Sequence, residues 1–150
     1  MAHIHEKIDF VVEVFIVHEN KVLLRLHDKY RIWLSIGGHI ELDEDPNQAA
    51  LREVKEEVGL TIQLLDTRSK ELVEKSEGEL IAPMFLKRHN INADHEHVVM
   101  TYFATADSDM IIPESETDQW KWVTKEDLKS MDLKPDIRIY AERALETLGT

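Results

Sequence analysis

The sequence predicts an α/β fold in which a mixed β-sheet is flanked by helices. Residues 8–17 and 21–26 are runs of β-branched, aliphatic and aromatic residues separated by a short polar break, as in two paired strands. The hydrophobic period changes to that of a helix after Pro46 and again after Pro135. Because these helical segments are interspersed with further strand-like runs, we expect helices packed on a sheet.

The helix after residue 45 has both a start signal and a stop signal. Asp45 suits the N-cap, Pro46 suits the first helical position, and Gln48 completes a capping-box-like pattern. Gly59 stands where a glycine commonly ends a helix. The other helices are predicted to start after Thr124 and at Pro135, and the strands to cover 8–17, 21–26, 32–36, 60–65, 79–89, 97–106 and 120–123.

Length and composition indicate an ordinary globular protein. The 150 residues, of which 43% are hydrophobic and 32% charged, suit a single domain spanning 1–150, and no repeat or composition shift divides it. The absence of cysteine excludes disulfides and thiolate ligands, so any metal must be bound by carboxylate, carbonyl or imidazole groups.

Charge and hydropathy narrow the classes of function. A formal net charge of −12 argues against a nucleic-acid-binding protein that works through a broad basic patch, but it does not exclude a small anionic substrate that binds with a metal ion. No apolar run approaches the roughly 20 residues that cross a bilayer, and residues 1–7 lack the pattern of a signal peptide. We therefore expect a cytoplasmic protein without a membrane partner.

Three glutamates gather on one side of the predicted helix 46–58. Glu53, Glu56 and Glu57 project away from an aliphatic stripe that includes Val54 and Val58. Carboxylates three or four residues apart on a helix are neighbours, and their repulsion costs about a few tenths of a kcal/mol per pair. A solvated acidic face is the ordinary explanation of such a pattern. The residues around the helix must therefore distinguish a solvated face from a metal site.

The surroundings favour a metal site. Gly37 and Gly38 follow a predicted strand just before the helix, Glu44 lies in the intervening loop, and Arg52 can pair with Glu56 four residues later. Hard divalent cations such as Mg²⁺ take oxygen ligands and are often shared with substrate phosphates. Such ions can activate water and neutralise the charge that develops at a phosphorus centre.

This segment resembles the sequence box of the Nudix (MutT-like) hydrolases. The box is Gly, five residues, Glu, seven residues, Arg-Glu, an aliphatic residue, any residue, Glu-Glu, any residue, Gly and an aliphatic residue. Every spacing is kept here, by Gly38, Glu44, Arg52, Glu53, Val54, Glu56, Glu57, Gly59 and Leu60. The order of predicted elements around the box also fits the family, so the resemblance implies a Nudix-type α/β/α sandwich.

The resemblance also implies a chemistry and a site. Nudix hydrolases cut a phosphoanhydride bond in a nucleoside diphosphate linked to another moiety, with Mg²⁺ or Mn²⁺. It implies that Glu53 and Glu57 are the main metal ligands, that Glu56 is a further ligand or orients water, and that the Gly38 carbonyl adds a contact. Arg52 and Glu44 would orient these acids. Which carboxylate is the general base is left open.

Residues outside the box are further candidates. Some family members place another catalytic or metal-binding glutamate shortly before a late tryptophan, and Glu116 is similarly placed, with Glu114 as the second choice. His95 and His97 share a strand face and are candidates for substrate binding or for a second metal site. The aromatic rings of Tyr30 and Trp33 are candidates for stacking on a base, with core packing as the alternative.

The predicted function is hydrolysis of a (d)NTP, or of a modified (d)NTP, to the monophosphate and pyrophosphate. The alternatives are an ADP-ribose or other nucleotide-sugar pyrophosphatase, and a non-catalytic Nudix module that senses a nucleotide. ADP-ribose hydrolases of the family often have proline where this chain has Lys75, and an intact set of box acids favours an enzyme. Homodimers are common among relatives, so a homodimer is kept as an option.

Overall fold

A computed structural model describes residues 6–150. The start of the segment 1–7, on which the signal-peptide prediction rested, lies outside the described residues. Within residues 6–150 the chain forms one mixed sheet of eight strands and four helices. The strands are β1 (Ile8–His18), β2 (Lys21–Leu26), β3 (Trp33–Leu34), β4 (Ile36–His39), β5 (Ile62–Leu64), β6 (Phe85–Asn92), β7 (His95–Ala106) and β8 (Gln119–Val123).

The long strands β1 and β7 form the centre of the sheet and run parallel to each other. β1 is antiparallel to β4 along its middle and to β2 at its end. β7 is antiparallel to β6 along its first half and to β5 at its end, while β2 carries β3 and β8. This combination of one parallel pair with antiparallel neighbours confirms the predicted mixed sheet.

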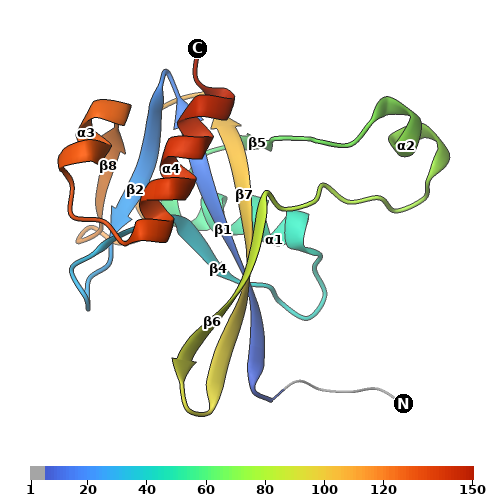
Figure 1. The fold of residues 1–150 in the computed structure, drawn as a ribbon, viewed down its shortest axis with the longest axis horizontal. Coiled ribbons are helices and arrows are strands. Elements are labelled where there is room, and N and C mark those ends of the chain that lie inside the picture. The colour runs from blue at the N-terminus through green and yellow to red at the C-terminus, as the bar shows by residue number, and fades with distance from the viewer. Residues whose placement is uncertain (1–5) are drawn as a thin grey trace.

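The helices cover both faces of the sheet, as Figure 1 shows for α1 and α4. Their bounds are α1 (Pro46–Val58), α2 (Lys70–Lys75), α3 (Lys125–Ser130) and α4 (Pro135–Leu148). Because neighbouring strand residues point to opposite faces, Val12 and Val14 of β1 pack on the α1 side, whereas Phe15 and Val17 pack on the α4 side. The result is the predicted α/β/α sandwich with a core on each side of the sheet.

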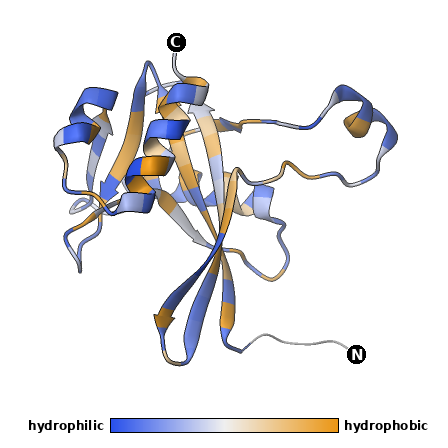
Figure 2. Cartoon of the chain, viewed as in Figure 1, coloured by the Kyte–Doolittle hydropathy of each residue, from blue (hydrophilic) through white to orange (hydrophobic). Residues whose placement is uncertain are grey.

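The hydropathy of the strands matches this arrangement. Apolar residues concentrate in the strands that lie between the helices, whereas the far end of the β6–β7 hairpin is hydrophilic (Figure 2). That hairpin extends beyond the helices, so the side chains on its faces are largely exposed or half-buried. Polar residues in this part of the hairpin can line the surface or a cleft without entering the hydrophobic core.

Helix α1 begins and ends where the sequence predicts. The Asp45 carboxylate accepts a hydrogen bond from the Gln48 N–H at 2.9 Å, and the Gln48 side chain accepts one from the Asp45 N–H at 3.0 Å. Gly59 follows with φ of 71°, and its N–H donates to the Lys55 carbonyl. These local contacts fix where the glutamates of α1 stand along the helix axis.

The structure differs from the sequence prediction in the segment 66–84. The predicted strand 79–89 begins only at Phe85, because Pro83 has no N–H to donate to a neighbouring strand. Asn47 of α1 instead holds this segment by accepting from the Ile81 N–H and donating to its carbonyl, each at 2.9 Å. The short helix α2 was not predicted; it lies away from the sheet, without a buried residue (Figure 1).

No helix within residues 6–150 is both long enough and apolar enough to cross a membrane.

Candidate active site

The glutamates of α1 face β4 and the loop that connects β4 to the helix. The glycine at position 38 permits this approach, since a Cβ there would lie 2.3 Å from the nearer Glu53 carboxylate oxygen. The side chains of Glu53 and Glu57 are 14% and 11% exposed, whereas that of Glu56 is 52% exposed. Two of the three carboxylates that α1 presents are therefore largely withdrawn from water, which a solvated acidic face would not require.

Arg52 holds the acidic groups of this site in place. Its guanidinium donates to Glu44 at 2.6 and 2.9 Å, to Glu53 at 3.0 Å, to Glu56 at 3.1 Å and to the His39 carbonyl at 2.9 Å. The hydrogen bonds with Glu44 raise the pKa of Arg52 and lower the pKa of Glu44. Arg52 and Glu44 therefore form an ion pair, and Arg52 also connects this pair to Glu53 and Glu56.

Glu57 is the acidic residue of the site whose negative charge is least stabilised by its surroundings. Burial raises the pKa of its carboxyl group to about 7, against the opposing effect of the Arg25 guanidinium 3.7 Å away. The negative charge of Glu53 and a hydrogen bond from the Gly37 N–H also act on it, in opposite directions. One carboxylate oxygen, Oε2, is buried without a hydrogen-bond partner. Such an oxygen is the kind of group that a bound cation would satisfy.

The loop before β8 packs on the end of α1. The Ile112 N–H donates to the Val58 carbonyl at 2.8 Å, and the Glu114 N–H donates to the Glu57 carbonyl at 3.1 Å. Gly59 makes room for this loop, since a Cβ there would lie 2.8 Å from the Ile112 side chain. The charge of Glu114 also contributes to the raised pKa of Glu57. The structure thus brings the backbone of Glu114 next to the site, whereas Glu116 lies further along the loop; both residues are exposed.

A cleft of about 360 Å³ extends from Glu57 along the face of the sheet that carries α4. Glu57 and Gly37 line it, together with Lys87, Lys134 and His97. The strand register shows its direction, because Gly37 lies opposite residue 13 of β1 and His97 lies beside residue 9 of the same strand. At about 3.3 Å per residue, the two positions are roughly 13 Å apart. This length and volume suit a small molecule that bears charged and apolar parts.

The four predicted substrate contacts lie in different places. His97 lines the cleft, and His95 lies two residues earlier on β7. Trp33 packs against the core beneath α4, which is the alternative considered for the aromatic residues. Tyr30 is 62% exposed and stands beside His27, with ring centroids 5.1 Å apart.

Sequence reasoning missed three cationic groups of the site. Arg25 of β2 pairs with Glu57 and with Asp118, while Lys87 and Lys134 line the cleft from β6 and from the start of α4. Lys87 also pairs with Asp136. These residues come from distant parts of the chain and follow no motif, so only the fold places them near the glutamates.

The donor atoms of the site fit a hard divalent cation. The predicted ligands Glu53, Glu56 and Glu57 supply carboxylate oxygens, without a sulfur atom. Mg²⁺ and Mn²⁺ prefer such oxygen ligands. The unpartnered Glu57 Oε2 and the close approach of residue 38 to Glu53 are both consistent with a position for an ion between α1 and β4.

Comparison with known proteins identifies the family. The family model described as NUDIX domain matches residues 9–144. The chain is similar to a solved hydrolase of the NUDIX family from Clostridium perfringens, at 38% identity over 93% of this chain and 97% of that one, with a TM-score of 0.85. The chain therefore belongs to the Nudix family and is a Nudix hydrolase.

More distant structures share the fold. A MutT NUDIX hydrolase from Burkholderia pseudomallei is 23% identical over 95% of this chain and 99% of that one, with a TM-score of 0.65. A MutT protein from Methanosarcina mazei Go1 is 18% identical over 99% of this chain and all of that one, also with a TM-score of 0.65. No curated protein matched the chain. Nudix hydrolases act on nucleoside diphosphate-linked compounds and generally use a divalent metal ion.

Proposed function

We propose that this Nudix hydrolase converts a (d)NTP, or a modified (d)NTP, to the monophosphate and pyrophosphate. The observation that carries the proposal is the position of Glu57, whose buried and unpartnered carboxylate oxygen belongs to a residue that lines the cleft. A charged group in that position is costly to the fold unless it binds a cation. The matched family model covers residues 9–144, so in this proposal residues 1–150 work as one Nudix domain.

In this proposal Glu53, Glu56, Glu57 and the Gly38 carbonyl hold Mg²⁺ or Mn²⁺. The bound ion would activate water and neutralise charge on the phosphates. Arg52 keeps Glu53 and Glu56 directed to one side by donating to both, and it is itself fixed by Glu44.

The remainder of the substrate would occupy the cleft on the α4 side of the sheet. Lys134 supplies positive charge there, as does Lys87, which is paired with Asp136, while Leu34 and Ile137 provide an apolar wall. Such a mixture suits a nucleoside attached to phosphates. His97 bounds the cleft at the end away from Glu57, so it would contact the part of the substrate that is distant from the reacting phosphate.

The test is hydrolysis of a panel of nucleotides with identification of the products. The panel contains the common dNTPs, an oxidised dNTP, ADP-ribose, a UDP-sugar and a dinucleoside polyphosphate, each with Mg²⁺ and with EDTA. We expect the highest kcat/KM for a (d)NTP, with pyrophosphate and monophosphate as products and no turnover in EDTA. Faster cleavage of ADP-ribose or the UDP-sugar would replace the proposal by the nucleotide-sugar alternative.

Matched variants test the site within the same panel. Glu53→Gln and Glu57→Gln keep the side-chain shape while removing the charge, and we expect turnover to be lost in both. Glu77→Gln is the control, since Glu77 is exposed in the loop after α2. Rates near those of the unmodified protein in either box variant would refute the assignment of ligands.

A further inference from the structure

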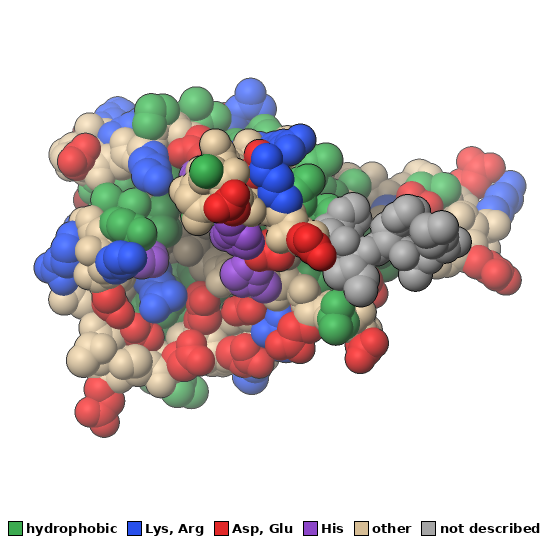
Figure 3. Space-filling view, turned by 90° about the horizontal axis from the view of Figure 1, so that it is seen from below, with side chains coloured by type: hydrophobic (Ala, Val, Ile, Leu, Met, Phe, Trp, Pro, Cys, Tyr) green, Lys and Arg blue, Asp and Glu red, His purple; other side chains and the backbone are tan. Residues whose placement is uncertain are grey.

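A second group of metal-binding side chains lies outside the box, where β1, β4 and β7 meet. In the strand register Asp9 is beside His97, and His39 is opposite Val11, two residues from Asp9. His95 precedes His97 by two residues on the same strand. Since strand residues two apart share a face, all four side chains project from the same side of the sheet. Figure 3 shows histidine side chains gathered on this face of the molecule with acidic side chains beside them.

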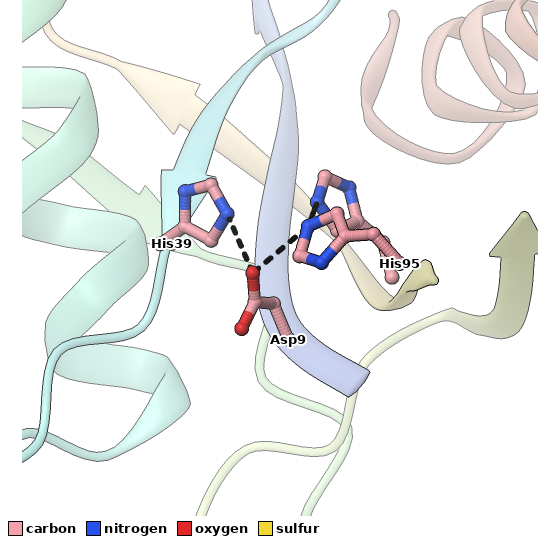
Figure 4. A group of neighbouring side chains, drawn as sticks. Asp9, His39 and His95 are labelled. Atoms are coloured by element: carbon pink, nitrogen blue, oxygen red, sulfur yellow. Dashed lines mark hydrogen bonds and ion pairs between the residues drawn. The ribbon is translucent and has the colours of Figure 1, made fainter. Parts of the chain in front are cut away.

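The donor atoms of the four side chains converge. The Asp9 carboxylate oxygen Oδ2 is 3.0 Å from His95 Nε2 and 3.5 Å from His39 Nε2, as drawn in Figure 4. His95 Nε2 is 3.2 Å from His97 Nε2. One ligand atom from each of the four residues lies within 4.8 Å of all the others. Around a tetrahedral Zn²⁺ with bonds of about 2.0–2.1 Å, neighbouring donors are about 3.3 Å apart. The observed spacing is therefore already near that of a metal site.

We propose that Asp9, His39, His95 and His97 form a second metal-binding site, selective for a borderline transition-metal ion such as Zn²⁺. Three imidazole nitrogens and one carboxylate oxygen are a common ligand set for Zn²⁺. The same set is unfavourable for Mg²⁺, which prefers oxygen ligands and retains its waters. The chemistry of the donors thus separates this site from the all-oxygen site of the box.

The carboxylate and the imidazoles of the group are close enough to interact electrostatically. Burial lowers the pKa of His97, and the neighbouring His39 and His95 lower it further, against the opposing effect of Asp9. The Asp9 carboxylate is the acidic group that contacts two of the rings, and it supplies one negative charge for the bound ion.

The two sites lie on opposite sides of β4. A Cβ at position 38 would point at Glu53 of α1, whereas the next residue, His39, directs its side chain toward Asp9. The His39 carbonyl accepts a hydrogen bond from Arg52, so its backbone is fixed by the box while its imidazole remains available. No side chain that we assign to the Mg²⁺ site belongs to the histidine site. An ion bound there would connect three strands at the point where the sheet extends beyond the helices.

The test is binding of the metal alone, without nucleotide. The protein carries His3→Ala and His5→Ala throughout, because those two histidines lie outside the described residues. Zn²⁺ binding is followed by calorimetry and Co²⁺ binding by its visible absorption, both in excess Mg²⁺ so that the box is saturated. The variants are His95→Asn and Asp9→Asn, with Glu53→Gln as the box variant and His89→Asn as the matched control. His89 is a half-buried histidine opposite His97 on β6 and lies outside the group of four.

We expect one Zn²⁺ per chain and the intense absorption of tetrahedral Co²⁺, both retained in Glu53→Gln and His89→Asn. His95→Asn and Asp9→Asn should weaken affinity by at least about 10-fold, the lower limit seen when even an outer partner of a metal ligand is removed. Unchanged affinity in those two variants, an equal loss in His89→Asn, or displacement of Zn²⁺ by Mg²⁺ would overturn the proposal. Since no reaction is measured, its failure would not affect the proposed hydrolysis, and the converse also holds.

Discussion

Replacing Glu57 by glutamine should stabilise the metal-free protein while abolishing its activity. The Glu57 side chain is 11% exposed, one of its oxygens is buried without a partner, and Arg25 compensates its charge only partly from 3.7 Å. Glutamine has nearly the same shape and no charge. The substitution therefore removes the electrostatic cost of the carboxylate and leaves the packing of α1 against the sheet in place.

The magnitude follows from the pKa of Glu57. The folded protein raises this pKa from 4.5 to about 7, which corresponds to about 3 kcal/mol at about 1.4 kcal/mol per pH unit. Below pH 4.5 the group is protonated in both the folded and the unfolded chain, so it costs the fold no charge burial. As the pH rises from 4.5 through 7, the free energy of unfolding falls, and above pH 8 the full cost is present.

The assay is urea unfolding in EDTA between pH 5 and pH 9, comparing the two proteins. We expect Glu57→Gln to be more stable than the unmodified protein by about 3 kcal/mol at pH 8, with the difference vanishing toward pH 4.5. Glu56→Gln is the control; its side chain is half-exposed, so the change should be below about 1 kcal/mol. A difference that does not depend on pH, or a Glu57→Gln protein that is less stable at pH 8, would refute the reasoning.

Four further substitutions test the geometry of the box and of the loop that packs on the end of α1. Gly38→Ala places a methyl group where the Glu53 carboxylate lies, so kcat should fall by about 100-fold while the circular dichroism spectrum stays unchanged. A fully active variant would show that the close approach of residue 38 to Glu53 is not needed. In Arg52→Lys the lysine side chain cannot contact Glu44, Glu53 and Glu56 together. We expect the Mg²⁺ concentration that gives half the maximal rate to rise by about 10-fold, and an unchanged value would contradict this role of Arg52. Glu114→Ala should lower kcat more than Glu116→Ala, since the negative charge of the Glu114 side chain acts on Glu57 and alanine removes it. The reverse order would restore Glu116 as the functional residue of the loop.

The box could be read from the sequence because its signals are local. The cap formed by Asp45 and Gln48, the glycine at position 59 and the spacing of the glutamates all act within one helix and its two neighbouring turns. Their geometry follows from the helix period, whatever the remainder of the chain does. The strands near the N-terminus were predicted well for a related reason, since their apolar runs are long and uninterrupted.

Predictions that depended on distant contacts were less complete. Glu116 and Glu114 are two residues apart in a polar loop, and they are distinguished by the N–H of Glu114, which donates to α1, and by its charge, which acts on Glu57. The segment 79–84 has the composition of a strand, yet Asn47 and the proline at position 83 hold it outside the sheet. The proline is a local signal, whereas Asn47 and the end of α1 are tens of residues away from the segments that they contact.

The sequence by itself determined the family resemblance, the α/β/α fold class and the helix that carries the glutamates, because each depends on residue type and short spacing. Only the tertiary structure decided which acid is buried, where the cleft runs and that Asp9 and His39 join His95 and His97. Burial and charge are properties of the space around a side chain, and that space is filled by strands that are far apart in sequence. The register of β1 with β4 and β7 therefore brings together ligands that no linear motif connects.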